Sequence, residues 1–567
     1  MREYLMLSKL LLKMQFKKDK QKKGSRANMI AMIALGAYFA VVIAVVMIIF
    51  GKYIGEYDFV AETGATIMLL GFMLVLIFGI TSVLSYMYFS PDNEFLMSMP
   101  VRPSVIYAAK LTSIYAMNVL FSTLLILPGL LFLGISSGQG FLFFIMIPVA
   151  VVLVPVLPLL LASLLAIPLM YVTSFFRRKG LITTILLIVI FAGAMTAYMV
   201  FSFGGLSSSS TETEFDIAAV VAMIKDMLAG TSVIIYPLLS FARFMTMTSG
   251  LSDNLALSML IDGGIFFGTL AVLAAIVFIF SAAFYRKSTL RQTENPIINI
   301  KGKREHVQSS AYSALLKKEW KELIRNPSFA FQCLMSVVIC PLFAAGMSFM
   351  LGGVMFEDMD ATLSIDFYYM MSWILPLFFV QMFGIGMNLF SMTAITREGK
   401  TYEVSKIIPV PYDIQLKAKK TLGMIISFTS VTISLIIMEI AQIYNGNYNP
   451  VLFIGTAIMF CIYNYGFNCY LINRDLKNPK LDWSTPAEAV KNNTRTIVPV
   501  LINTGVVMIV AVIIIIFSAI GEAAGSAIIA TAIGFIPLIG GSVLFSFFMH
   551  RALNRNTEVY YNRLGDN

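Results

Sequence analysis

The sequence predicts an all-α integral membrane protein of twelve transmembrane helices, arranged as two tandem halves of six. Three observations predict this fold. First, 58% of the 567 residues are hydrophobic and 13% are charged, whereas globular proteins carry about 25% charged residues. Second, the uncharged runs are long enough to cross a bilayer. Third, two motifs recur in the second half of the chain. The composition excludes most soluble enzymes, disordered proteins and secreted disulfide scaffolds.

The uncharged runs locate the spans, because a helix needs about 20 apolar residues to cross about 30 Å of hydrocarbon. The run 111–176 is too long for one span, and the turn-forming residues 136–140 interrupt it, so it predicts two helices. In the first half, spans are expected at 29–50, 63–89, 104–135, 141–175, 181–205 and 260–285. In the second half, they are expected at 328–352, 366–392, 413–440, 449–472, 496–519 and 524–549.

The positive charges predict the orientation. With twelve spans, 38 of the 41 Lys and Arg residues fall on the side of the N-terminus. The positive-inside tendency therefore places both termini in the cytoplasm. A further span at 227–242 would move the ten positive charges of 286–325 to the outside, so we do not expect one. The segment 212–242 is expected instead to be a re-entrant or amphipathic piece on the outer side.

Two motifs indicate a duplicated chain. Residues 11–17 resemble residues 315–321 at an offset of 304, and each copy predicts a basic amphipathic helix before the first span of its half. A second motif around Pro100, with Glu94 before it and Lys110 after it, recurs around Pro409 at an offset of 309. Both motifs occupy the same topological positions, which predicts halves at 1–300 and 301–567.

Catalytic and cofactor-binding patterns are missing from the sequence. The loop 286–325 is too short for a nucleotide-binding domain, since domains start at about 50 residues. Gly399-Lys400-Thr401 ends like a phosphate-binding loop, but Ala394 stands where that pattern needs glycine. No hydrolase or metalloprotease pattern occurs, and the cysteines and histidines lack metal-ligand spacing. We expect no enzymatic activity, bound cofactor, metal or nucleic acid.

The spans also carry almost no ionisable groups, which ion-driven carriers need near the middle of the membrane. Glu439 and Asp262 are placed near span ends, where solvated anchors are usual. The energy source is therefore expected on another polypeptide. Neutral polar residues remain in the spans, either lining a conduit or forming hydrogen bonds between helices. These residues are Asn118, Gln381, Asn388, Asn464 and Asn468.

At these motifs the chain resembles the permease subunits of ABC transporters, in the type-2 exporter class, as a Firmicute-type fused form that carries both transmembrane halves. Residues 1–20 and 310–326 are similar to the amphipathic elbow helices of that family. Residues 90–103 resemble its cytoplasmic coupling segment, and residues 397–411 are the weaker counterpart in the second half. The loop 473–493 resembles a cytoplasmic loop of these permeases.

The resemblance implies a multi-pass exporter subunit in the bacterial cytoplasmic membrane, in contact with lipids. Two copies of a separate ABC ATPase, which would bind ATP and Mg²⁺, would drive it by alternating access. The coupling segments would dock these ATPases. The charged residues expected to make the contacts are Asp92, Glu94, Arg102, Arg397, Glu398, Lys400, Glu403 and Lys406.

The substrate class that suits an uncharged, methionine-rich conduit is amphipathic, peptide or lipid-like. The sequence departs from the family in the loop 518–526, which is too short for the outer helices that family members carry there. Three other interpretations stay open. They are an ion-coupled or facilitative secondary transporter, a membrane scaffold or signalling partner of an ATPase, and a lipid-processing enzyme, which the missing catalytic residues disfavour.

Overall fold

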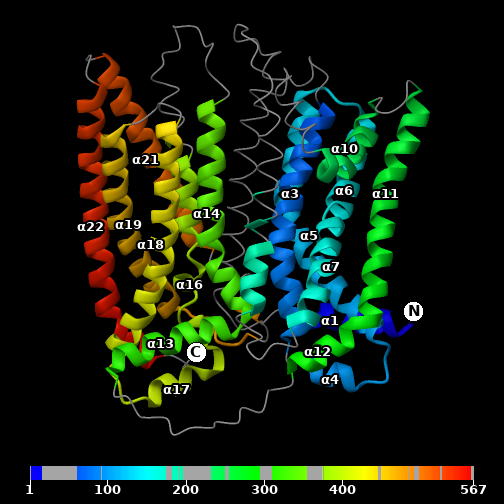
Figure 1. The fold of residues 1–567 in the computed structure, drawn as a ribbon, viewed down its shortest axis with the longest axis horizontal. Coiled ribbons are helices and arrows are strands. Elements are labelled where there is room, and N and C mark those ends of the chain that lie inside the picture. The colour runs from blue at the N-terminus through cyan, green and yellow to red at the C-terminus, as the bar shows by residue number, and fades with distance from the viewer. Residues whose placement is uncertain are drawn as a thin grey trace. The chain divides into compact units, whose positions relative to one another are not determined.

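The computed structural model describes residues 2–15, 60–90, 92–173, 182–190, 192–193, 196, 232–248, 254–293, 309–353, 373–374, 376–444, 449–483, 486–490, 497–523 and 527–563. Every regular element in these ranges is a helix (Figure 1). The chain divides into two compact units. The first unit comprises Met1–Thr183 and Val200–Ile297, and the second comprises Thr184–Met199 and Ile298–Asn567.

Seven helices in the described ranges are long and apolar enough to cross a membrane, and a bent helix beginning at Pro103 makes an eighth. The protein is therefore an all-α membrane protein, as its composition predicts. The expected span at 29–50 and most of the span at 181–205 lie outside the described residues. The number twelve and the orientation stay predictions.

In the first unit, the predicted break at residues 136–140 is confirmed, because Gly138 adopts φ +66°, a left-handed conformation that glycine tolerates. The helices of this unit are α1 (Arg2–Gln15), α3 (Val60–Val83) with a π-helical turn (Leu84–Tyr88), α4 (Asn93–Ser98), α5 (Pro103–Ser136), α6 (Phe141–Leu153), α7 (Val156–Thr173), α10 (Ser232–Thr246), α11 (Leu255–Phe280) with a π-helical turn (Ser281–Tyr285), and α12 (Arg286–Thr293).

In the second unit, α13 and α17 lie at the end of the unit from which α14 and α18 start (Figure 1). Its helices are α13 (Ala311–Arg325), α14 (Pro327–Gly353), the π-helix η4 (Val380–Gly386), α16 (Leu389–Met392), the 3₁₀-helix η5 (Thr396–Thr401), α17 (Tyr402–Ile407), α18 (Tyr412–Tyr444), α19 (Pro450–Lys477), α20 (Pro486–Val490), α21 (Ile497–Ala523) and α22 (Ala527–Asn562).

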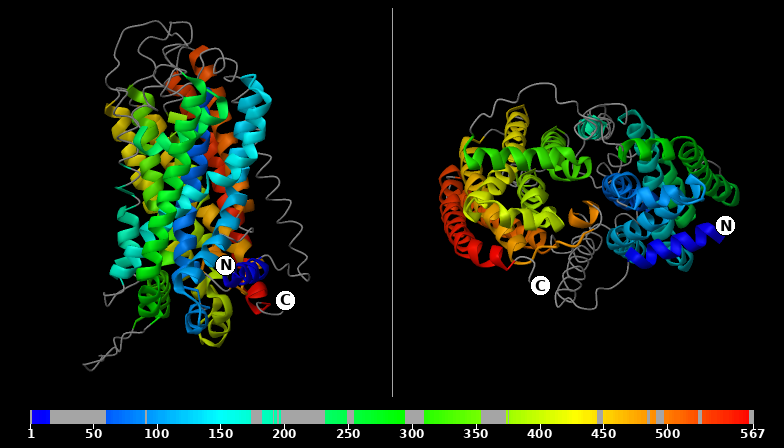
Figure 2. Two further views of the ribbon diagram at one scale, coloured as in Figure 1. Left: turned by 90° about the vertical axis from the view of Figure 1, so that its right-hand side faces the viewer. Right: turned by 90° about the horizontal axis from the view of Figure 1, so that it is seen from below.

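The helices α1 and α13 lie across the ends of the long helices of their own units rather than along them (Figure 2). Each packs against the long helix that follows the short polar helix, α1 against α5 and α13 against α18. The two contacts are made in the same way. The Tyr4 hydroxyl hydrogen-bonds Thr112 Oγ1 at 2.7 Å, and the Tyr312 hydroxyl donates to Thr421 Oγ1 at 2.8 Å.

These tyrosine contacts correct the register of the first repeat. They pair residue 4 with residue 312, an offset of 308, instead of the 304 that the sequence motif indicates. The two alignments differ by four residues, which is about one helical turn of 3.6 residues. A slip of one turn keeps the same faces aligned, so sequence similarity alone does not exclude it. The corrected offset of 308 is within one residue of the 309 of the second motif.

The short polar helices repeat the same plan. Helix α17 begins and ends 309 residues after α4, and α18 begins 309 residues after α5. Between them, Val101 N donates to Met99 O and Val410 N donates to Ile408 O, both at 2.8 Å. Each bond closes a tight turn around a proline, Pro100 or Pro409, whose fixed φ stiffens the path.

The expected outer segment at 212–242 is described only from residue 232 onward, where α10 forms. This helix packs against α3 and α11, and Phe241 stacks on Phe266 with ring centroids 4.3 Å apart. Within the first unit, α10 lies at the end opposite α4 and α12 (Figure 1).

Candidate functional site

Two short stretches carry the charged residues expected to meet a partner. We name residues 92–102 the first polar segment and residues 396–411 the second polar segment. Five of the eight expected residues are exposed, namely Asp92, Glu94, Arg102, Lys400 and Glu403, and Lys406 is half-buried. Arg397 and Glu398 are buried. These two residues are therefore internal to the second polar segment, and the other six stay candidates for surface contacts.

Apolar side chains stand on the surface of both segments beside the carboxylates. Phe95 on α4 is 66% exposed, and on α17 Val404 is 56% and Ile407 80% exposed. Phe95 and Val404 occupy equivalent positions, one residue after Glu94 and Glu403. An apolar side chain bordered by charge is typical of the surface that one protein offers to another.

The first polar segment is held from inside by hydrogen bonds from a buried lysine to uncharged acceptors. Lys110 on α5 donates to Asn93 Oδ1 at 2.5 Å and to the Tyr86 carbonyl at 2.9 Å. Asn93 Nδ2 donates to the Met87 carbonyl at 2.9 Å, and the Tyr285 hydroxyl donates to the same oxygen at 3.2 Å. The π-helical turn after α3 and the one after α11 are thus tied to the start of α4.

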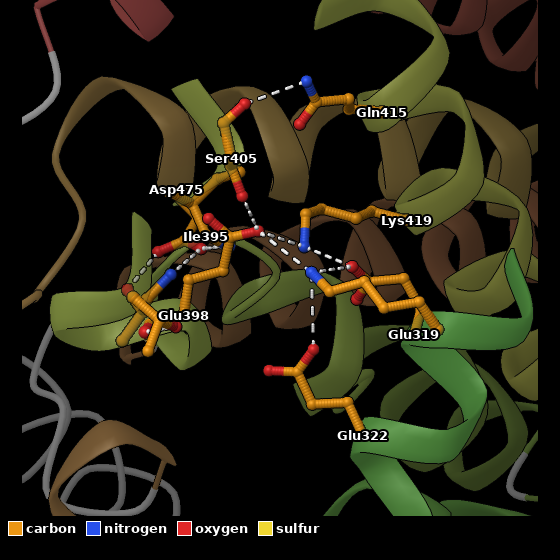
Figure 3. Close-up of polar contacts among 11 residues, drawn as sticks. Glu319, Glu322, Ile395, Glu398, Ser405, Gln415, Lys419 and Asp475 are labelled. Atoms are coloured by element: carbon orange, nitrogen blue, oxygen red, sulfur yellow. Dashed lines mark hydrogen bonds and ion pairs between the residues drawn. The ribbon is translucent and has the colours of Figure 1, made fainter. Parts of the chain in front are cut away.

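The second polar segment is held instead by buried ions (Figure 3). Lys419 Nζ on α18 lies 2.7 Å from Glu319 Oε1 on α13 and 2.8 Å from Glu398 Oε1 on η5. The side chains of Lys419, Glu319 and Glu398 are only 3%, 6% and 3% exposed. Lys318 Nζ, which is 42% exposed, lies 3.4 Å from Glu319 and 3.9 Å from Glu398. We name these four residues the ion cluster.

Glu319 is ionised in this environment. Burial alone would raise the pKa of its carboxyl group, but the ammonium groups of Lys419 and Lys318 and the Arg397 guanidinium outweigh burial, so that the pKa is lowered. The Ser405 hydroxyl on α17 donates to Glu398 Oε1 at 3.1 Å, which ties α17 to the same cluster. Charge-assisted bonds of this kind are the stronger class of hydrogen bond.

The start of the second polar segment is fixed by Asp475 at the end of α19. Its carboxylate accepts hydrogen bonds from the backbone amides of Ile395 at 2.6 Å and Thr396 at 2.9 Å. On the other side, Trp483 Nε1 donates to the Thr396 carbonyl at 2.7 Å. Gly399 follows with φ +52°, and a Cβ placed there would meet the Trp483 ring at 2.9 Å. Glycine is needed for both reasons.

Arg397 completes the interior of this segment. Its guanidinium group lies 3.6 Å above the centroid of the Phe390 ring and donates to Cys333 Sγ at 3.8 Å. Arg397 also lines a small pocket together with Glu398, Lys419 and Glu319. Among the described residues, no group of three or more His, Cys, Asp or Glu side chains could hold a metal ion. The ion pairs of the cluster connect α13, η5 and α18.

Three of the five candidate conduit residues bond to one another. Asn388 Nδ2 donates to Asn468 Oδ1 at 2.8 Å and to the Gly423 carbonyl at 2.9 Å. Asn468 Nδ2 donates to Asn464 Oδ1 at 2.8 Å and to Ser427 Oγ at 3.1 Å. The network joins the start of α16 to α18 and α19. These contacts are those of interhelical hydrogen bonding, and a conduit role stays a prediction.

The two remaining candidates lie elsewhere. The Gln381 carbonyl in η4 accepts a hydrogen bond from Asn503 Nδ2 at 3.2 Å, and Asn118 is buried on α5 in the first unit. All five candidates are at most 2% exposed. At an offset of 309, the residues of the first unit equivalent to Asn388 and Asn468 are Gly79 and Leu159, which have no polar side chain. The buried amide network is thus a property of the second unit.

Sequence reasoning missed the ion cluster as a site. Lys419 was visible only as part of a repeated motif, and Glu319 as one charge of an amphipathic helix. A signal was nevertheless present, because Lys419 shares the helix face of Leu416, Leu422 and Ile426, which are all buried. A lysine on the apolar face of a helix needs a buried partner.

Comparisons with known proteins add no relative to this picture. No family model matches the chain, and no curated protein or solved structure matches it either.

Proposed function

We propose that the chain is the transmembrane permease of an ATP-driven exporter, and that its two polar segments dock separate ABC ATPase subunits. In this proposal the chain has two halves of six spans in the bacterial cytoplasmic membrane. Helices α1 and α13 are the elbow helices, α4 and α17 are the coupling helices, and both termini are cytoplasmic. The proposal extends the resemblance seen in the sequence.

One observation carries the proposal. Each unit holds a six-residue helix, α4 or α17, at the same place between two long helices, and each projects an exposed carboxylate beside an exposed apolar side chain. A docking element must transmit force, so it must be held rigidly. Both helices are held rigidly, one by Lys110 and Asn93 and the other by the ion cluster.

The mechanism would follow from this geometry. ATP binding to the partner subunits would draw the ATPases together and displace α4 and α17. Each displacement would pass through the proline turn into α5 or α18, because these helices start directly after the turns. The two halves would then alternate between access from one side and from the other, and would move an amphipathic, peptide or lipid-like substrate.

Copurification tests the docking. The chain, purified in mild detergent from the membrane in which it is naturally expressed, should carry two copies of an ABC ATPase. The double variant E94K/E403K should release it, since both exposed carboxylates become cations. The matched control is E3K/E558K, which reverses two exposed carboxylates outside both segments. Undiminished ATPase binding by E94K/E403K would contradict the assignment of these segments as docking sites.

An ion-coupled carrier is the second candidate, and one observation favours it. Glu439 on α18 is only 8% exposed, and neither carboxylate oxygen has a hydrogen-bond partner among the residues that the structure describes. A buried, unpaired carboxyl group in a membrane helix is a typical proton or ion site. Proton flux into liposomes that contain this chain alone, and its loss in E439Q, would favour the carrier over the exporter.

A further inference from the structure

We infer that Lys419 is a positioning residue that couples the second polar segment to the surface helix α13, and that the first unit lacks this coupling. The two docking sites would then be mechanically different. The inference deepens the proposed function, on which the word docking rests. Its test needs no ATPase, so that the two proposals can fail separately.

Three elements meet at one ammonium group. Lys419 belongs to α18, Glu319 to α13 and Glu398 to η5, which leads directly into α17. Both carboxylates lie within 2.8 Å of Lys419 Nζ. The Lys419 Nζ atom thus contacts carboxylates of both α13 and η5, and so it links the surface helix to the second polar segment.

Burial makes this connection hard to break. Removing one partner of a buried ion pair leaves an uncompensated charge in a medium of low dielectric constant, which is strongly unfavourable. Neither carboxylate can move away from Lys419 alone without this penalty. A displacement of η5 therefore favours a concerted displacement of α13.

The first unit differs at the equivalent positions. Lys110 is the counterpart of Lys419, and its two hydrogen bonds go to Asn93 and the Tyr86 carbonyl, both close to the first polar segment in sequence. In the register set by the tyrosine contacts, Leu11 on α1 is the counterpart of Glu319. A leucine offers no acceptor to an ammonium group. Helix α1 is tied to α5 through Tyr4 and Thr112, and among the described residues 2–15 no ion pair to the first polar segment is found.

The coupling would reach the bilayer surface. Helix α13 exposes Lys317, Lys321 and Trp320, which are residue types that suit the headgroup region. Movement of the second polar segment would therefore be resisted by an element anchored at that surface. Movement of the first polar segment would be transmitted to α5 and to the π-helical turns at Met87 and Tyr285, but not to α1.

Hydrogen exchange of the full chain in lipid nanodiscs tests the inference. In E319Q, which replaces the ionic link by at most a neutral hydrogen bond but keeps the Lys419–Glu398 pair, exchange of residues 311–325 should rise at least about tenfold, equivalent to about 1.4 kcal/mol. Exchange of residues 396–407 should stay within about twofold. In K110M, exchange should rise in residues 92–102 and stay unchanged in residues 2–15. Unchanged exchange of α13 in E319Q would overturn the inference.

A double-variant cycle tests whether a change in η5 is transmitted to α13. G399A strains η5, and this strain should raise the exchange of α13 in the otherwise unchanged chain but add nothing in the E319Q background. K419R, which preserves a cation between the carboxylates, should restore the transmission that K419M abolishes. Equal effects of G399A on α13 in both backgrounds would show that Glu319 and Lys419 do not carry it.

Discussion

The two polar segments follow the same backbone path but are supported by different chemistry. Each contains a six-residue helix and a tight proline turn, and each is followed by a buried lysine at an equivalent position, Lys110 on α5 or Lys419 on α18. The first lysine is satisfied by an amide oxygen and a carbonyl oxygen, the second by two carboxylates. The exposed carboxylate and apolar side chain recur on both segments. The surfaces of the two segments are thus alike while their interiors differ, as expected if both surfaces serve the same task.

The same contrast extends toward the interior of the bundle. Asn388 and Asn468 form a hydrogen bond in the second unit, whereas the equivalent residues of the first unit, Gly79 and Leu159, have no polar side chain. Directional polar bonds restrict a helix interface to one arrangement more strongly than apolar packing does. The second unit is therefore the more rigidly specified of the two.

The largest expected effect separates the two lysines. K419M leaves two buried carboxylates without their shared cation and should destabilise the fold by about 3–5 kcal/mol. K110M leaves an amide and a carbonyl unsatisfied and should cost about 1–3 kcal/mol. Unfolding in a denaturing detergent measures both. Equal losses of stability in the two variants would contradict the claim that ion pairs hold the second segment and uncharged acceptors hold the first.

A smaller effect is expected inside the bundle. N468L removes the acceptor of Asn388 and the donor to Asn464, and should destabilise the second unit by about 1–3 kcal/mol. The matched change L159M in the first unit conserves volume and should cost less than about 1.5 kcal/mol. The same unfolding measurement compares them, and a cost for L159M as large as that for N468L would contradict the polar network.

A loss of stability of similar size is expected when Gly399 of the second polar segment is replaced. G399A places a Cβ against Trp483 at a positive φ and should cost about 1–3 kcal/mol. The equivalent residue of the first unit is Ser90, whose hydroxyl makes a 3.4 Å contact with Asp92, so S90A should cost less than about 1 kcal/mol. Thermal unfolding of both variants tests this prediction, and a larger loss of stability in S90A than in G399A would contradict it.

The smallest effect is the pH dependence that Glu319 of the ion cluster contributes to stability. The pKa of Glu319 is lowered in the folded protein by Lys419 and Lys318 despite its burial. Its contribution to stability is therefore complete above the pKa of the unfolded chain, about 4.3, and is lost as the pH falls through the lower folded pKa. Unfolding temperatures measured against pH should show this loss, and E319Q should weaken it. An identical acid response in E319Q would contradict the assignment.

Part of this structure could be predicted from the sequence because it depends on local chemistry. The break after Ser136 follows from glycine and serine, and the amphipathic helices follow from their periodicity. The register of the first repeat could not be fixed, since a slip of one turn aligns the same faces. The ion cluster could not be found either, because Lys419 and Glu319 are 100 residues apart in sequence. Only tertiary packing shows that Arg397 and Glu398 are buried while Lys400 and Glu403 are exposed.

The central claim is that α4 and α17 are the surfaces through which a separate ATPase acts on this chain. Photo-crosslinking tests it most directly, with a photoreactive residue at Phe95 or Val404 and a control at the exposed Leu10 on α1. We expect adducts with the ATPase from both segments and none from the control. Lipid adducts in place of ATPase adducts at Phe95 and Val404 would contradict the claim, because these side chains would then face the bilayer.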